Sequence, residues 1–335
     1  MSAPSPAATA ERPEAAVRAG QALRTVGRIR AEHVRDYGIL AVLVAIFVTL
    51  SILSPVFLTE RNLLNLVFAN ATVGIPACAV TYVIIAGNFD LSIGAVFALC
   101  ETLAAWGAVH LDVWAAFPIA LVAGGVLGLF NGVLVTKLRV NSFLATLASA
   151  LAFSGIALGI TGGFEITPTS SVFTFLGQQK LGPIQYPDLI FLVVAVATGI
   201  VLAFTVLGRQ MYAVGGNREA ARLSGIKVDR VVIVTFVITG IGAGIAGLID
   251  ASTTGSGSSA GGTSLALSAI AGVALGGTSI FGGSGAIWRT VVGVLMLGMI
   301  TNGFDILGVA TFWQEIVEGA LIVGAVAIGS MVQRR

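Results

Sequence analysis

The chain has 335 residues, of which 56% are hydrophobic and only 10% charged, and its formal net charge is +2. Soluble domains carry about 25% charged residues, so this composition excludes an ordinary water-soluble protein. Apolar runs of roughly 20 residues, long enough to cross a bilayer, recur from Tyr37 to the C-terminus. They predict an all-α integral membrane protein with about ten transmembrane helices.

Residues 1–36 precede the first apolar run and contain no hydrophobic core of a signal peptide. Because this segment is rich in Ala and Pro, we expect a disordered cytoplasmic tail, followed by a polytopic membrane domain over residues 37–335. The predicted spans are 37–55, 63–86, 91–109, 113–136, 142–161, 189–207, 231–251, 262–280, 287–304 and 312–330.

Basic residues sort strongly between the loops that join these spans. With the N-terminus inside, 16 of the 18 Lys and Arg residues lie on the inner side, and only Arg61 and Lys180 lie outside. Basic residues in short loops stay in the cytoplasm because they resist translocation. The sorting therefore predicts that both termini are cytoplasmic.

Residues that support catalysis or metal binding are sparse. Cys78 and Cys100 fall within spans and are expected to be small buried side chains, so no metal site is predicted. Ser284 lacks the base that a serine nucleophile needs, because His33 and His110 fall far from it in the predicted topology. No stretch matches the phosphate-binding pattern of ATPases. We expect a transport subunit rather than an enzyme, with no cofactor in this chain.

Two glycine-rich stretches, residues 84–99 and 273–288, interrupt an apolar helix with a turn and then resume it. Glycine permits local unwinding and close backbone approach in membrane helices. Asp90 or Ser92 can cap the helix after the first turn, and Thr278 or Ser284 can serve the second. The similarity of the two stretches hints at an internal repeat, as in many transporters. The residues of these glycine-turn motifs are Gly87, Asp90, Ser92, Gly94, Gly276, Gly277, Gly282, Gly283 and Gly285.

Four blocks, in order along residues 60–330, resemble the membrane permeases of ribose-type bacterial ABC sugar importers. The stretch "VIIAGNFDLSIGAVFAL" is similar to the family signature "GGIDLSVGSVLAL", and residues 208–231 are similar to "GRxxYAxGGNxxAARLSGI". Residues 130–163 resemble "NGxLVxxLxVxPFIxTLGxxxxxxGxALxxTGG", and residues 270–309 contain a match to "GGTSLxGGxGS". The sequence departs from the family at Asn88, Phe89, Asn141 and Ser268, where Gly, Ile, Pro and an acidic residue are usual.

The resemblance implies a permease subunit of a binding-protein-dependent ABC importer in the bacterial cytoplasmic membrane. Such a subunit forms the pathway for a monosaccharide or a related polyol. The implied partners are a second permease copy, ABC ATPase subunits that hold ATP and Mg, an extracytoplasmic sugar-binding protein and membrane lipid, with no nucleic acid.

The cytoplasmic segment 208–230 is polar although apolar runs flank it. Its "REAAR" stretch favours a short helix, which Asn217 can cap and Gly225 can end. The spacing alone fits either a solvated basic loop or a helix that docks into a partner. The resemblance implies the coupling helix, which sits in a cleft of the ATPase, with Ala221 on the buried face. The expected ATPase-coupling residues are Asn217, Glu219, Ala220, Ala221, Arg222, Leu223, Gly225 and Ile226.

Polar and aromatic side chains within the spans are candidates for the solute pathway. Ionisable groups there usually face protein or water, which makes Glu101 either a pathway residue or a structural one. Asparagines also join helices by hydrogen bonds, and aromatic residues more commonly pack in the core or against lipid. The candidate pathway residues are Asn70, Glu101, Asn131, Phe130 and Phe304.

Two outer loops complete the expected surface. Residues 162–188 are either a docking surface for the binding protein, with Glu165 and Asp188 as contacts, or a plain connector. Residues 252–264 are expected to form a flexible connector. The alternative function is a stand-alone secondary carrier for a small polar solute, which would transport without an ATPase and for which Glu101 is a candidate coupling carboxylate. A purely structural membrane subunit leaves segment 208–230 unexplained.

Overall fold

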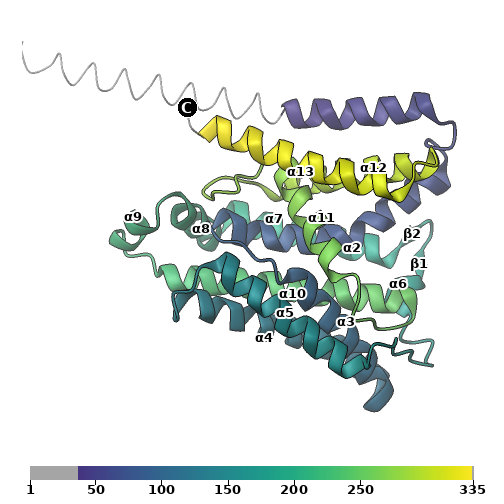
Figure 1. Cartoon of the computed structure of the whole chain (residues 1–335), viewed down its shortest axis with the longest axis horizontal. Coiled ribbons are helices and arrows are strands. Elements are labelled where there is room, and N and C mark those ends of the chain that lie inside the picture. Colours follow the sequence, from purple (N-terminus) through teal and green to yellow (C-terminus); the bar gives the residue numbers. More distant parts are fainter. Residues whose placement is uncertain (1–36, 334–335) are drawn as a thin grey trace, which may run out of the picture.

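The computed structural model describes residues 37–333 as a bundle whose helices mostly run along one long axis (Figure 1). The predicted tail, residues 1–36, lies outside the described residues. The first described helix is Tyr37–Leu53. The labelled elements are α2 (Glu60–Ile85), α3 (Ile93–His110), the 3₁₀ turn η1 (Val113–Ala115), α4 (Ala116–Thr136), α5 (Ser142–Thr161), α6 (Phe175–Gln178), β1 (Lys180–Leu181), β2 (Ile184–Gln185), α7 (Tyr186–Phe204), α8 (Val206–Gly216), α9 (Arg218–Leu223), α10 (Val228–Thr254), α11 (Gly262–Leu275), α12 (Ile287–Ile306) and α13 (Thr311–Gln333).

Each predicted span contains one helix, so the prediction of an α-helical membrane protein is confirmed. Seven helices among the described residues are long and apolar enough to cross a membrane. The other three predicted spans hold the first described helix, α11 and α13. Since α11 has 14 residues, it reaches only about 21 Å, against roughly 30 Å of hydrocarbon. The count of ten spans and the orientation of the termini therefore stay predictions.

Burial divides the bundle into an inner and an outer set of helices. The most apolar windows of α3 and α10 are mostly buried, whereas those of α4, α5 and α7 are mostly exposed. The exposed side chains on these outer helices are large and apolar, for example Leu151 on α5 and Val193 on α7. An apolar outer surface of this extent fits lipid rather than water as the solvent.

Glycines allow a close helix crossing between α4 and α10. A Cβ added to Gly124 of α4 would overlap the backbone oxygen of Gly240, and a Cβ on Gly240 would overlap that of Gly124. One turn further along each helix, Gly128 of α4 and Gly244 of α10 make similar close contacts with backbone oxygens of the other helix. Spacing of small residues four apart lets two backbones approach, which is a common way to join helices in membranes.

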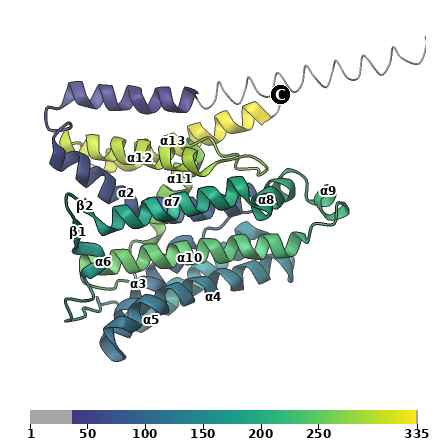
Figure 2. The same cartoon turned by 180° about the vertical axis from the view of Figure 1, so that it is seen from behind.

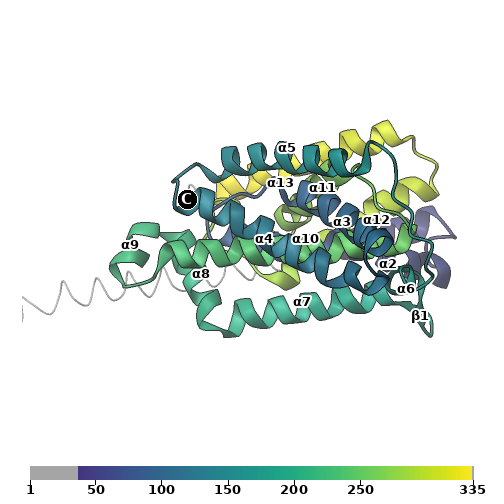
Figure 3. The ribbon, with the colours of Figure 1, turned by 90° about the horizontal axis from the view of Figure 1, so that it is seen from below.

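The two ends of the bundle carry different elements. The α9 helix protrudes at one end, and α6 with the β1–β2 hairpin lies at the other (Figures 1 and 2). Viewed from below, α9 again lies beyond the end of the long α10 (Figure 3). We refer to these as the α9 end and the hairpin end.

Three predicted boundaries are wrong. The span predicted over 262–280 stops as a helix at Leu275, because glycine turns follow. Segment 208–230 is not mainly a loop, because Thr205 breaks the chain into α7 and α8, and α8 continues to Gly216. The outer connector predicted over 252–264 is helical up to Thr254 and again from Gly262.

Candidate functional site

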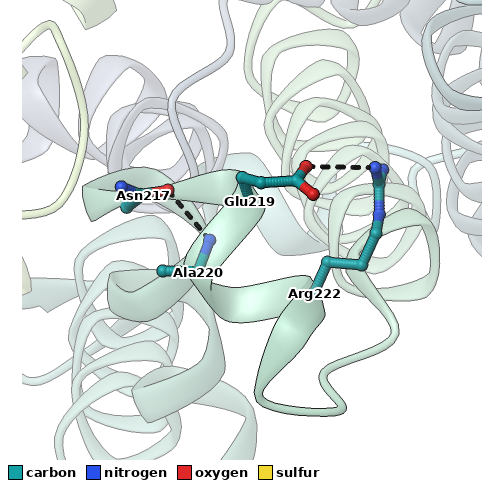
Figure 4. Close-up of polar contacts among 4 residues, drawn as sticks. All are labelled: Asn217, Glu219, Ala220 and Arg222. Atoms are coloured by element: carbon teal, nitrogen blue, oxygen red, sulfur yellow. Dashed lines mark hydrogen bonds and ion pairs between the residues drawn. The ribbon is translucent and has the colours of Figure 1, made fainter.

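The predicted short helix in segment 208–230 is present as α9. The side chain of Asn217 caps its start by accepting a hydrogen bond from the backbone N–H of Ala220 at 2.9 Å (Figure 4). Gly225 has a φ of +83°, and the N–H groups of Gly225 and Ile226 donate to the oxygens of Arg222 and Ala221. This is the glycine-ended pattern that closes a helix. The sequence therefore located both ends of α9 correctly.

Charges on α9 lie on its exposed side. Glu219 and Arg222 form an ion pair with 3.5 Å between Oε2 and Nη1, and both side chains are mostly exposed (Figure 4). The acidic residue in the first turn and the basic residue in the last turn match the helix dipole. Exposed pairs of this kind contribute about 0–1 kcal/mol, so the pair fixes orientation more than stability.

The apolar side chains of α9 do not share one face. Leu223 is 81% exposed, and Ala220 is exposed beside the cap. Ala221 is 4% exposed because it packs into the core of its own chain, and Ile226 packs partly against the same core. The expectation that a partner buries Ala221 is therefore wrong, and Leu223 is the large apolar side chain of α9 that is exposed.

The two glycine-rich turns, predicted separately, meet each other and the end of α8. The N–H of Gly283 donates to the oxygen of Ile85 at 2.9 Å, and a Cβ added to Gly282 would lie 2.8 Å from Cα of Gly87. A Cβ on Gly215 would overlap the oxygen of Ile85. We call these five residues the glycine junction. Positive φ values at Gly87, Gly282 and Gly283 favour glycine at these points.

The remaining motif glycines serve close packing. Gly94 of α3 contacts the backbone of Gly262 at the start of α11, and Gly276 contacts the backbone of Arg289 on α12. Gly277 has a φ of +71°, and Gly285 lies against the side chain of Ile85. These contacts hold the turns against their neighbouring helices. Whether the two stretches form an internal repeat stays a prediction.

Polar side chains hold the first glycine turn from three sides. Asp90 accepts hydrogen bonds from the N–H and hydroxyl of Ser92, and Asn131 donates to the Ser92 hydroxyl at 2.7 Å. Thr146 of α5 accepts from the N–H of Leu91. Burial raises the pKa of the Asp90 carboxyl to about 6, although its hydrogen bonds partly oppose this rise. A buried network of hydrogen bonds therefore holds the turn where it leads into α3.

The predicted caps have mixed outcomes. Ser92 is the N-cap residue of α3, but its side chain makes no capping bond to the helix. Neither Thr278 nor Ser284 caps α12, since its N-cap residue is Ala286 without a side-chain bond. That part of the prediction is wrong because the second turn is closed instead by backbone bonds, such as that from Ser279 to Ser284.

A cavity of about 550 Å³ lies between α2, α3, α10, α11 and the loop after α10. Glu101, Glu165 and Asp250 bring carboxylates to it, and among the described residues no lysine or arginine lines it. Oε1 of Glu101 accepts from the N–H of Ser258 at 2.9 Å. The hydroxyl groups on its wall belong to Thr72, Thr254, Ser256, Ser258, Ser264 and Ser268. The volume lies within the range of roughly 300–1,000 Å³ that is typical of ligand pockets.

Of the five predicted pathway residues, only Glu101 lines this cavity. Asn70 donates to the backbone of its own helix, and Asn131 is fully buried in the network around Ser92. Phe130 is half-exposed and contacts Phe153, with 5.9 Å between ring centroids. Phe304 is partly buried on α12, away from the cavity lining.

The loop over residues 162–188 is packed onto the bundle, and its role as a docking surface or a connector stays a prediction. Gly177 donates from its N–H to Ser252 of α10 at 2.8 Å, and Glu165 accepts from Ser256 at 3.0 Å. Asp188 is buried and accepts from the N–H of Gln185, which caps α7. The expectation that Asp188 contacts a partner is therefore wrong, whereas Glu165 is exposed at the cavity.

Three departures from the family motifs have partners in the structure. Asn141 caps α5 by accepting from the N–H of Phe143. Asn88 accepts a hydrogen bond from Arg218 of α9, and Ser268 donates one to Glu318 of α13. The sequence flagged Asn88 and Ser268 only as unusual residues. Their hydrogen-bond partners lie far away in the sequence, so the residues next to them gave no indication of these bonds.

Comparisons with known proteins agree with the family resemblance of the sequence motifs. Residues 62–326 match the family described as the permease component of branched-chain amino acid transport systems. The chain is 39% identical to the ribose import permease RbsC of Bacillus subtilis (strain 168), with 84% of this chain and 88% of the relative covered.

Two Escherichia coli (strain K12) proteins are also similar. Identity is 36% with the ribose import permease RbsC, over 88% of this chain and 92% of the relative. The identity is 32% with the xylose transport system permease XylH, over 83% of this chain and 87% of the relative. No solved structure matches the chain. The chain therefore belongs to the ribose-type permease family of bacterial ABC importers, which are multi-pass proteins of the inner membrane.

Proposed function

We propose that the chain is the transmembrane permease subunit of a binding-protein-dependent ABC importer for a monosaccharide or a related polyol. ATP and Mg bind to a separate ATPase subunit, and an extracytoplasmic sugar-binding protein delivers the solute. Two copies of the chain form one pathway within the membrane lipid. The relatives named for ribose and xylose support a sugar as the solute.

The observation that carries this proposal is α9. It is capped at Asn217, ended at Gly225 and exposed at one end of the bundle, with Leu223 directed away from its own chain. A short helix with an exposed apolar residue fits recognition in a partner's groove. The basic residues of segment 208–230 support a cytoplasmic location for this end by the positive-inside rule, and an ATPase would meet it there.

The cavity supports a hydroxylated solute that carries no negative charge. The hydroxyl groups on its wall can donate hydrogen bonds to sugar hydroxyls and accept them, and the carboxylates can accept them. Its described lining residues include acidic residues and no lysine or arginine, so it offers no counter-charge to an anionic sugar such as a sugar phosphate. In the proposed orientation the cavity opens on the outer half of the membrane, where the binding protein releases its solute.

A secondary carrier is the second candidate, because Glu101 is a carboxylate within a predicted span and lines the cavity, as the ion-coupling carboxylate of a carrier would. Co-purification separates the two functions. We expect the chain, expressed with a candidate ABC ATPase from the same organism, to retain that ATPase through detergent purification. A permease that is pure and folded but never retains the ATPase would favour the carrier.

A further inference from the structure

The base of α9 is joined rigidly to the membrane bundle. A single extended residue, Asn217, separates the end of α8 from the start of α9 and caps α9 with its side chain. Its N–H also donates to Ala213 of α8 at 3.0 Å. Because both helices are fixed at this residue, a movement of α9 is transmitted to α8 rather than absorbed by a flexible linker.

Arg218, the first residue of α9, reaches across to the first glycine turn. Its Nη2 donates a hydrogen bond to Oδ1 of Asn88 at 2.8 Å. Asn88 is only 3% exposed and its own amide group donates to Ala86, so its oxygen is held in place for Arg218. A hydrogen bond to a charged donor is among the stronger ones in proteins.

The same turn is locked to the end of α8 through the glycine junction. Gly215, two residues before Asn217, packs so tightly on Ile85 that a Cβ would overlap its oxygen. Gly283 of the second turn is bonded to the same oxygen. Movement of α8 and α9 therefore acts on both glycine turns together.

Each turn is joined directly to a helix that lines the cavity. The first turn leads into α3, where Glu101 lies eight residues beyond Ile93, or about 12 Å along the axis. The second turn follows α11, which supplies Ser264 and Ser268 to the cavity wall. The base of α9 is thus connected, through the two glycine turns, to two of the helices that line the cavity.

We propose that the Arg218–Asn88 hydrogen bond is a positioning contact that transmits the movement of α9 to the first glycine turn and so couples ATP hydrolysis to solute release. This proposal rests on the proposed function. Arg218 does not bind solute or ATP. It sets how much solute is moved for each ATP that the partner hydrolyses.

The test measures sugar uptake and ATP hydrolysis together, in proteoliposomes that hold the permease, its ATPase and the binding protein. Arg218→Met keeps the aliphatic stem and removes the donor, and Arg218 is exposed, so the fold should be retained. We expect hydrolysis to continue while uptake per ATP falls by about five-fold or more, a typical allosteric coupling factor. Arg218→Lys keeps a cationic donor and should keep a higher ratio of solute taken up to ATP hydrolysed than Arg218→Met.

Asn88→Ala removes the acceptor and should lower the ratio to the same extent. The double variant should be no worse than either single one, because both remove the same contact. Arg209→Met, an exposed arginine of α8, is the matched control and should keep the parent ratio.

The proposal is overturned if Arg218→Met keeps the parent ratio, if Arg209→Met lowers it equally, or if the double variant loses the sum of both effects. In each case the parent importer still works, so the proposed function stands. Uptake by the parent chain without any ATPase would overturn both.

Discussion

Leu223 is the residue whose change separates docking of α9 from folding of the chain. It is 81% exposed, so its side chain contributes almost nothing to the packing of its own protein. If the ATPase buries it, Leu223→Ala removes most of the transfer free energy of a leucine side chain. Full burial of such a side chain stabilises by about 1.5–3 kcal/mol, and allowing for the Cβ that alanine keeps leaves about 1–2 kcal/mol.

This loss corresponds to ATPase binding weakened by roughly 5- to 30-fold. Leu223→Asp also places an unpaired charge in the interface, and we expect a loss on the order of a hundredfold or more. The thermal stability of the isolated permease should not change, because exposed substitutions usually shift stability by no more than about 0.5 kcal/mol. The assay is titration of the ATPase against immobilised permease, with thermal unfolding of the same samples.

The matched control is Leu111→Ala, which changes a leucine that is 64% exposed at the C-terminal end of α3. It should bind the ATPase with the parent affinity. Ala221→Asp is a poorer probe, because Ala221 is buried in its own chain and the variant should lose thermal stability. Parent affinity in the folded Leu223→Asp variant would refute the docking of α9.

Three further changes test the bundle, the cavity and the topology. Gly240→Ala should lower the thermal stability by roughly 1–3 kcal/mol, because its Cβ overlaps α4. Gly155→Ala, with open space at its Cβ, should stabilise the chain by up to about 1 kcal/mol; equal effects would contradict the packing. Glu101→Gln removes a carboxylate from the cavity and should lower uptake without changing complex assembly, whereas unchanged uptake would make Glu101 structural. Ser171→Cys should react with an impermeant thiol reagent from outside, and Lys227→Cys only after the membrane is opened; labelling of both from one side would contradict the ten-span orientation.

Local signals were enough to predict the helices and the ends of α9. Apolar runs locate spans because lipid leaves the backbone no partner outside the helix. Asn217 and Gly225 mark the ends of α9 because capping and left-handed backbone depend on single residue types. These features arise within a few residues of chain, so the sequence displays them directly.

Burial of individual side chains was not predictable in the same way. Ala221 and Leu223 are two residues apart on α9, yet one packs into the bundle and the other faces outward. The direction of each side chain depends on how α9 is attached to α8 and α10. That attachment is a tertiary property, which a six-residue pattern does not contain.

The cavity was only partly visible in the sequence. Glu101 stood out as a carboxylate within a span, whereas Asp250 lies near the end of the predicted span 231–251, where solvated carboxylates are common. The serines after α10 read as a flexible connector. The structure brings these groups together because α3, α10 and α11 meet at the hairpin end, and residues about 150 positions apart leave no periodic signal of such a meeting.

The dependence of transport on a separate ATPase tests the central claim most directly. The chain is reconstituted in vesicles with its binding protein and radiolabelled sugar, with ATP available to the ATPase on the face that carries α9, and with or without that ATPase. We expect uptake only when the ATPase and hydrolysable ATP are both present. Uptake at the same rate without the ATPase would contradict an ABC permease and identify a carrier.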